Sequence, residues 1–267
     1  MRRLLLSLIL LAASLGAAPP PRDIQRELLK IPTRPGVIQP ALLLTEGATP
    51  KAVALLFPGG SGKQSLLRRS IEVVLGPRGN FLVRSAEQLL TPELAVLILD
   101  CPSDQADGMN DGFRISDEHA ADIRAVLAAL RARFKGAMLH LVGTSRGTVS
   151  AAYVAQELGS AVDGVVLSSS VFRASGNNLG LSLFRFERLK TPLLLVHHAE
   201  DGCPSCPYGQ ARKLADKVPL ITVRGSIEPE SGPCDPLANH GFFGREVAVV
   251  QAIRNWILGL PYERDIP

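Results

Sequence analysis

Short apolar runs alternate with longer amphipathic segments along most of the chain. Residues 52–57, 95–100 and 137–142 are apolar at nearly every position, a pattern typical of strands that are buried on both faces of a parallel sheet. Residues 118–134 show the clearest helical periodicity, and Ser116 and Asp117 before them are typical N-cap residues. The same reasoning predicts further strands at 37–44, 162–168, 192–196 and 220–223, and helices at 22–30, 65–75, 83–90, 148–158, 209–217 and 245–258.

The repeated alternation of strand and helix indicates the fold class. Parallel strands need crossover connections, and helices normally make them and cover both faces of the sheet. We therefore predict an α/β protein with a doubly wound, mostly parallel sheet. A hydrophobic content of 46% is sufficient for a large core in one domain of this length.

The N-terminal residues have the organisation of a secretory signal. Arg2 and Arg3 precede an apolar stretch at 4–15, and small residues follow at 16–18. The stretch is too short to cross a bilayer comfortably as a mature helix, so we expect no stable membrane insertion. The predicted organisation is a signal peptide at 1–18, a lead-in at 19–36 and the folded domain at 37–260, in a periplasmic or secreted protein.

The charge balance gives no indication of a nucleic-acid partner. The formal net charge is +4, and the predicted signal peptide carries two of the positive residues. Lys and Arg are scattered, with no basic block beyond Arg68 and Arg69 and no ladder of aromatic residues. We therefore expect no nucleic-acid binding.

Residues 143–147 form the pattern G-x-S-x-G with Ser145 at its centre, between a predicted strand and a predicted helix. This context is typical of a nucleophile elbow, in which a sharp turn needs small residues two positions before and after the serine. The turn holds the serine hydroxyl clear of the backbone. Ser145 is therefore the candidate nucleophile.

A carboxylate and a histidine follow Ser145 in the chain. Asp201 comes directly after the predicted strand 192–196, at the edge where α/β sheets place catalytic groups. His240 lies in a Gly/Pro-rich loop before the last predicted helix, and it alone of the five histidines follows Asp201. A serine hydroxyl needs an imidazole to take its proton, and the imidazole needs a carboxylate to orient it. Glu200 and Asp235 are alternative acids.

The segment after strand 52–57 is rich in glycine and has two interpretations. One is an oxyanion loop, in which a backbone N–H of Gly60 or Ser61 acts together with that of Arg146. The other is a phosphate-binding P-loop, but Phe57 stands where that motif requires glycine and Gln64 where it requires Ser or Thr. The oxyanion loop is the better interpretation, and no nucleotide or other cofactor is expected.

Five segments together resemble the α/β-hydrolases of the serine esterase type, in particular small exported bacterial members whose substrates are poorly defined. The resemblance spans residues 37–258 and is carried by residues 57–62, 79–84, 143–147, 198–203 and 239–242. It implies the α/β-hydrolase fold and a Ser-His-Asp triad, but no particular substrate. In this family a cap is often inserted where residues 169–190 lie, and their small number implies at most a small cap.

Four cysteines in an exported chain favour at least one disulfide. In the implied fold the acid loop and the histidine loop meet, which brings Cys203 or Cys206 near Cys234. In the usual strand order of that fold Cys101 follows a strand about four positions away, roughly 19 Å at about 4.8 Å per strand, which is beyond the reach of a disulfide. Of the two remaining pairings we favour Cys203–Cys234, which would join the acid loop to the histidine loop. A metal site is not expected, because structural zinc usually takes two paired-ligand knuckles and only one Cys pair is present.

Two functions follow as hypotheses. The first is a serine hydrolase that cleaves a carboxylic ester or a related small acyl compound. The second is a binding protein that keeps the fold without the chemistry, although a degenerate descendant would usually have lost one of the three triad residues. Arg146 leaves a question open, since its side chain either borders the pocket and favours an anionic substrate or turns away into a salt bridge. The polar stretch 101–116 either borders the pocket or, as we favour, is a solvated loop.

Overall fold

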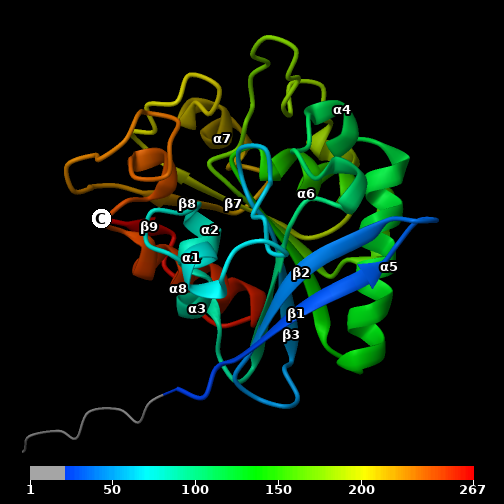
Figure 1. Cartoon of the computed structure of the whole chain (residues 1–267). Coiled ribbons are helices and arrows are strands. Elements are labelled where there is room, and N and C mark those ends of the chain that lie inside the picture. The colour runs from blue at the N-terminus through cyan, green and yellow to red at the C-terminus, as the bar shows by residue number, and fades with distance from the viewer. Residues whose placement is uncertain (1–21) are drawn as a thin grey trace, which may run out of the picture.

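A computed structural model describes residues 22–267, so the predicted signal peptide lies outside the described residues. These residues form one nine-stranded sheet in the order β1-β2-β4-β3-β5-β6-β7-β8-β9 (Figure 1). The strands β3 to β9 run parallel to one another, whereas β2 is antiparallel to both of its neighbours, β1 and β4. The bounds are β1 Gln25–Pro32, β2 Ile38–Thr45, β3 Ala52–Phe57, β4 Leu94–Leu99, β5 Met138–Thr144, β6 Gly164–Ser168, β7 Leu193–His198, β8 Leu220–Val223 and β9 Asp265–Ile266.

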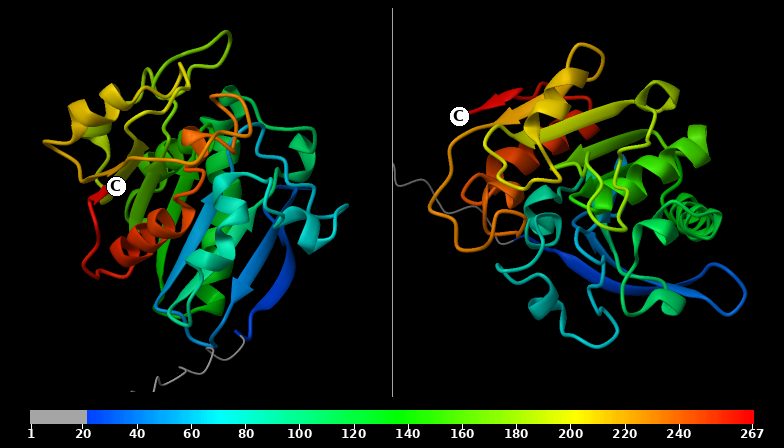
Figure 2. Two further views of the ribbon diagram at one scale, coloured as in Figure 1. Left: turned by 90° about the vertical axis from the view of Figure 1, so that its left-hand side faces the viewer. Right: turned by 90° about the horizontal axis from the view of Figure 1, so that it is seen from above.

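Helices cover both faces of this sheet, which confirms the predicted doubly wound α/β class. Two separate apolar cores result, with α5 and α6 against one face and α3 and α8 against the other (Figures 1 and 2). Every residue of β3, β4 and β7 is buried, as continuous apolar strands require. The helices are α1 Ile71–Val74, α2 Phe81–Arg84, α3 Ala86–Leu89, α4 Asp111–Arg114, α5 Asp117–Arg133, α6 Gly147–Leu158, α7 Tyr208–Leu214 and α8 Glu246–Ile257.

The predicted helix at 22–30 is wrong, because residues Gln25–Pro32 form the edge strand β1. Each of its residues pairs with β2, from Gln25 opposite Thr45 to Pro32 opposite Ile38. Pairing with a strand that is already part of the sheet outweighs a weak local preference for helix. The sheet thus extends beyond residues 37–260 at both ends, through β1 and β9.

The predicted helix at 65–75 is reduced to the single turn α1, and the one at 83–90 forms the two short helices α2 and α3. The Asp100 carboxylate explains why the helix predicted at 65–75 does not begin at residue 65. Its two oxygens accept hydrogen bonds of 2.7 Å from the backbone N–H groups of Gln64 and Leu66, and Ser65 between them has φ of +59°. Helical backbone is incompatible with that arrangement.

A disulfide joins Cys203, which follows β7, to Cys234, which precedes α8, the pairing that the sequence favoured. Their Cα atoms are 4.6 Å apart and 31 positions separate them in the chain. Cys101 and Cys206 are buried free thiols. In the described part of the chain, no helix is both long and apolar enough to span a membrane.

We expect the loss of this disulfide to lower the free energy of unfolding. Closing a loop of this length restricts the unfolded chain, and the chain-entropy relation gives about 3–4 kcal/mol. The double variant Cys203→Ser/Cys234→Ser avoids an unpaired partner thiol, and urea unfolding of both proteins measures the difference. Cys101→Ser is the matched control, because its thiol is buried but forms no disulfide. Equal unfolding midpoints for the double variant and the wild type would contradict this prediction.

Three buried histidines should make the fold sensitive to mild acid. Burial lowers the imidazole pKa from its usual 6.5 to about 3 for His119 and to about 4 for His140 and His197. Between these values and pH 6.5 the unfolded chain binds more protons than the native protein, so the free energy of unfolding falls as the pH falls. At about pH 5 we expect a loss on the order of 1–2 kcal/mol per histidine relative to neutral pH.

Urea unfolding between about pH 5 and pH 7.5 measures this loss. His119→Phe places an apolar ring between Phe57 and Phe113, which pack against the imidazole, and should make the pH dependence shallower. A variant with the same pH slope as the wild type would rule out a contribution from His119.

Candidate active site

Ser145 lies on a strained turn between β5 and α6. Its φ is +51°, a left-handed conformation that non-glycine residues seldom adopt. The two flanking glycines make the turn possible: a Cβ on Gly143 would lie 2.6 Å from the carbonyl oxygen of Gly147, and one on Gly147 would lie 1.9 Å from that of Phe57. Only residues without a side chain fit at these two positions.

Hydrogen bonds hold the backbone of this turn on both sides. The Ser145 N–H donates to the Ser168 carbonyl at 3.0 Å, which ties the turn to the end of β6. The Ser145 carbonyl accepts from the Thr148 hydroxyl at 2.6 Å and from the Thr148 N–H at 2.9 Å. The strained conformation is therefore fixed by the strand before it, the helix after it and the neighbouring strand.

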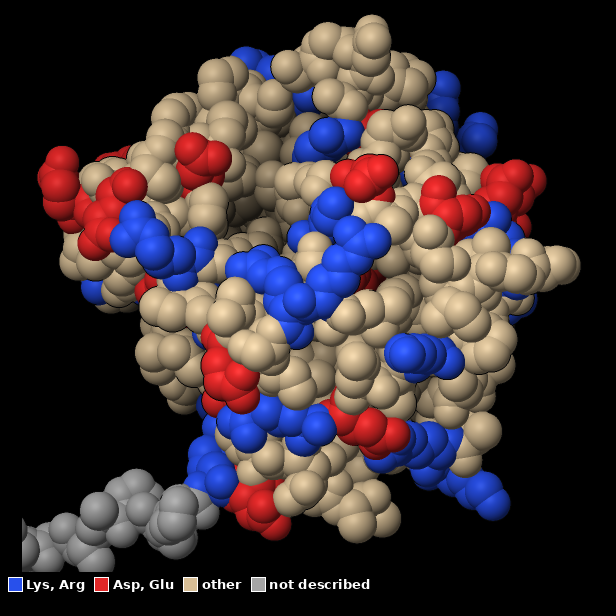
Figure 3. Space-filling view, in the orientation of Figure 1, with Lys and Arg blue, Asp and Glu red and all other residues tan. Residues whose placement is uncertain are grey.

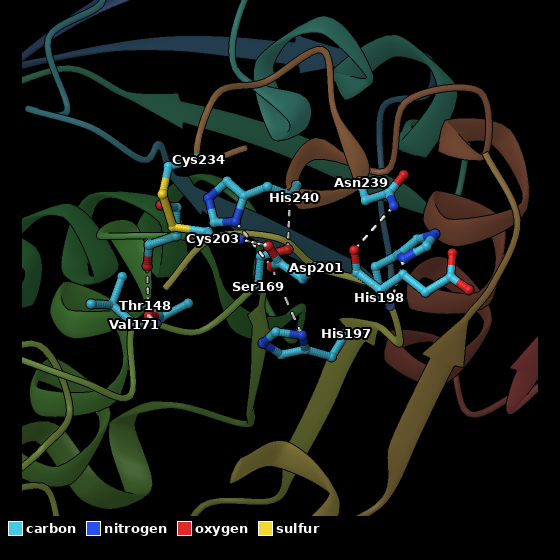
Figure 4. A network of polar contacts seen from close by, with 12 residues as sticks. Thr148, Ser169, Val171, His197, His198, Asp201, Cys203, Cys234, Asn239 and His240 are labelled. Atoms are coloured by element: carbon cyan, nitrogen blue, oxygen red, sulfur yellow. Dashed lines mark hydrogen bonds and ion pairs between the residues drawn. A yellow bond between two sulfur atoms is a disulfide. The ribbon is translucent and has the colours of Figure 1, made fainter. Parts of the chain in front are cut away.

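Asp201 and His240 are brought together by the ends of two distant segments (Figure 4). Asp201 follows β7, and its carboxylate is fully buried. One carboxylate oxygen accepts from His240 Nδ1 at 3.0 Å, and the other accepts from the Cys203 N–H at 2.9 Å. Of the alternative acids, Glu200 and Asp235 are exposed. Neither side chain is hydrogen-bonded to His240 in the described residues.

His240 lies in the short 3₁₀ turn η4 (Asn239–Gly241) before α8, and its side chain is 5% exposed. The Ser169 hydroxyl donates to its carbonyl oxygen at 2.7 Å. Because Nδ1 donates to Asp201, Nε2 is left as the acceptor of the neutral ring. Among residues 22–267, Nε2 has no hydrogen-bond partner.

Ser145 and His240 line one cavity of about 620 Å³, and no hydrogen bond joins their side chains. The loop after β3 forms another wall of this cavity with Gly59, Gly60 and Ser61. A Cβ on Gly59 would lie 2.9 Å from that of Ser145, so the loop packs directly against the turn. Within the described chain, the backbone N–H groups of Gly60, Ser61 and Arg146 donate to no acceptor.

Arg114, at the end of α4, lies behind this loop and is 1% exposed. Its guanidinium donates to the Gly60 carbonyl at 3.0 Å and to the Ser150 hydroxyl at 2.9 Å. Burial, and after it the charge of Arg146, lowers the Arg114 pKa to about 10. Arg114 therefore holds one peptide of the cavity wall in a fixed orientation.

From the sequence we favoured a solvated loop for residues 101–116, which include Arg114. The structure corrects this interpretation, because parts of the segment are buried. The neighbouring Asp111 is 2% exposed and accepts from the Gly180 N–H at 2.8 Å. Helix α4 is only four residues long, so no periodicity in the sequence could have indicated which of its side chains face inward.

The side chain of Arg146 turns away from the cavity. Its guanidinium donates to Asp111 at 2.6 Å and to the Asn178 side-chain oxygen at 2.5 Å. Asn178 belongs to the stretch 169–190, for which at most a small cap was expected, and the helical element that the structure describes in that stretch is the short 3₁₀ turn Phe186–Arg188. The open question about Arg146 is thus settled in favour of a salt bridge.

One group of side chains near the site has the composition of metal ligands. Cys203, Cys206 and His240 have potential ligand atoms within 4.8 Å of one another. The Cys203 sulfur is committed to the disulfide, and burial raises the pKa of the Cys206 thiol above its ordinary range. Without the Cys203 sulfur two potential ligands remain in this group, fewer than the four of a structural zinc site.

His197 and His198 contribute to packing and local hydrogen bonds. The His197 ring stacks on Phe172, with 5.9 Å between ring centres. His198 uses both nitrogens locally, with the Gly225 carbonyl and the Glu200 N–H each at 3.0 Å.

Solved structures with the same arrangement of strands and helices identify the fold. No family model matches the chain, and no curated protein matches its sequence. A dienelactone hydrolase from Anabaena variabilis is similar at 16% identity and a TM-score of 0.62, over 89% of this chain and 99% of that one. An α/β serine hydrolase homologue from Coxiella burnetii gives 16% and 0.55, over 88% and 96%.

A third similar structure, XC6422 from Xanthomonas campestris, is described as an α/β serine hydrolase without a lid. It is 17% identical with a TM-score of 0.54, over 90% of this chain and 97% of that one. The nearly complete coverage of each chain shows that the likeness concerns the whole described domain. The protein has the α/β-hydrolase fold.

Proposed function

We propose that the protein is a serine hydrolase that cleaves a carboxylic ester or a related small acyl compound. The observation that carries this proposal is the Asp201–His240 hydrogen bond, which leaves His240 Nε2 unpaired in the cavity that Ser145 also lines. A nucleophile, a base oriented by a buried carboxylate, and unpaired N–H donors are the groups that acyl transfer needs.

The proposed reaction begins when Ser145 Oγ attacks the acyl carbon and His240 Nε2 takes its proton. Asp201 stabilises the imidazolium that forms and keeps its orientation. The N–H of Arg146, with that of Gly60 or Ser61, binds the negative oxygen of the tetrahedral intermediate. His240 then protonates the leaving group and activates a water molecule, which hydrolyses the acyl-enzyme. In the resting protein the Ser145–His240 hydrogen bond is absent, as is common before substrate binds.

Arg114 has a positioning role in this proposal. Its hydrogen bond to the Gly60 carbonyl fixes the peptide next to the proposed oxyanion donors. A hydrogen-bond donor that is already oriented does not have to reorganise when negative charge develops on the substrate oxygen.

A fluorophosphonate should label wild-type protein once and Ser145→Ala not at all. The reagent reacts with a serine only when a base activates its hydroxyl, and intact-mass spectrometry counts the adducts. Ser160→Ala changes an exposed serine in the short turn after α6. It is the matched control and should be labelled like the wild type. Folded, oxidised wild type without an adduct would contradict the triad and favour a binding protein that lacks the chemistry.

Asp201→Asn should lower kcat for a p-nitrophenyl ester by roughly 10³–10⁴-fold, because the amide no longer holds the imidazole in its reactive tautomer. Circular dichroism and urea unfolding would verify that the variant is folded. Asp235→Asn is the control, since that carboxylate lines the cavity but makes no hydrogen bond to His240. A large loss of kcat in Asp235→Asn with little change in Asp201→Asn would reverse the assignment of the acid.

A further inference from the structure

The charged side chains around the cavity are mostly basic. Lys63, Arg69 and Arg78 line it together with Ser145 and His240, and Asp235 is the only carboxylate in this lining. Blue Lys and Arg side chains gather along the border of the hollow in the space-filling view (Figure 3). A cavity with an excess of one sign of charge raises the local concentration of ligands of the opposite sign.

These three cations are available to a ligand, unlike Arg146. Among residues 22–267, the Arg69 side chain makes no hydrogen bond or ion pair. Lys63 lies 3.3 Å from Asp107 and Arg78 lies 3.4 Å from Glu230, and both acids are exposed. Such exposed pairs contribute little stability, so an incoming anion exchanges with them at low cost.

Two aliphatic side chains line the cavity beside the two arginines. Arg69 precedes α1 and Arg78 follows it, and the α1 residues Val73 and Val74 line the cavity between them. Val73 is 54% exposed, so its side chain is accessible to a ligand in the cavity. The segment 69–78 therefore contributes both cationic and aliphatic side chains to the cavity lining.

We propose that this surface, the α1 anion subsite of Lys63, Arg69 and Arg78, binds a carboxylate on the substrate, so that the preferred substrate is an ester that carries a free carboxylate and a short apolar chain. This inference rests on the proposed function and specifies its substrate class. Guanidinium groups bind carboxylates through two parallel hydrogen bonds, and the valines contact the chain that connects the carboxylate to the ester.

Kinetics with a matched pair of esters tests the substrate class. The probes are the p-nitrophenyl monoester of glutaric acid and neutral p-nitrophenyl butyrate. For wild type, kcat/KM should be higher for the monoester and should fall as salt is added, because exposed charges are screened. In Arg69→Gln/Arg78→Gln the ratio of the two kcat/KM values should fall about tenfold or more, the effect of losing a charge-assisted hydrogen bond. Arg68→Gln, adjacent but outside this cavity, is the control.

Binding to Ser145→Ala tests the subsite without catalysis. Calorimetry with monomethyl glutarate should detect binding that weakens about tenfold or more in Ser145→Ala/Arg69→Gln/Arg78→Gln, whereas methyl butyrate should bind weakly to both. Inorganic phosphate is the second probe, and tighter binding of phosphate than of monomethyl glutarate would overturn the carboxylate assignment.

These experiments distinguish a failure of the α1 anion subsite from a failure of the proposed hydrolase activity. A kcat/KM ratio that neither salt nor the double substitution changes would overturn the subsite, while the hydrolase would stand. Failure of wild type to cleave either ester or to react with a fluorophosphonate would overturn the hydrolase, and calorimetry would still decide whether the subsite exists. Absence of monomethyl glutarate binding to Ser145→Ala would overturn the subsite.

Discussion

Gly147 brings the start of α6 so close to the end of β3 that a Cβ at this position would lie 1.9 Å from the Phe57 carbonyl oxygen. This contact determines where the remaining parts of the site lie. It holds Ser145 in a left-handed turn above the sheet and places the loop after β3 directly beside it. Because parallel strands end at the same edge, the residues after β7 reach the same place. A larger residue at 147 would separate the serine from the loop that forms the cavity wall.

Several buried polar groups surround this contact, and each one needs partners. The Asp201 carboxylate accepts hydrogen bonds from His240 and from the Cys203 N–H. The Arg114 guanidinium donates to the Gly60 carbonyl and the Ser150 hydroxyl, while its Nε has no partner within the described residues. An unpaired buried charge would cost several kcal/mol. The pairing of these groups therefore makes the geometry around the cavity specific. The disulfide that begins at Cys203 further connects the acid loop to the histidine loop.

Some of the basic side chains near the site make contacts within the fold, and others border the cavity. Arg146 and Arg114 are used within the fold, one in a salt bridge to Asp111 and the other behind the β3 loop. Lys63, Arg69 and Arg78 remain exposed around the opening. Arg114 and Arg146 thus make contacts within the fold, and the exposed cations create a positive field around the opening. Only the second group has the freedom to select between ligands of different charge.

Local pattern in the sequence was sufficient to predict most strands, the helices α5, α6 and α8, and the order of Ser145, Asp201 and His240. Each of these features is contained in a short segment: an apolar run, a helical period, an N-cap or a G-x-S-x-G turn. The physical reason is that strand burial on both faces and helix capping leave a signature in neighbouring residues. The sequence by itself therefore determined the fold class and nominated Ser145, Asp201 and His240 as candidate site residues.

Contacts between distant segments decided the rest. Residues 25–32 form a strand because they pair with the edge of β2. The Arg146 side chain turns away from the cavity because it binds Asp111 and Asn178. The burial of Arg114 and the basic border of the cavity likewise depend on segments that meet only in the folded chain. No local pattern reports such contacts, since the free energy of a side chain in the fold depends on neighbours that lie far away in the sequence.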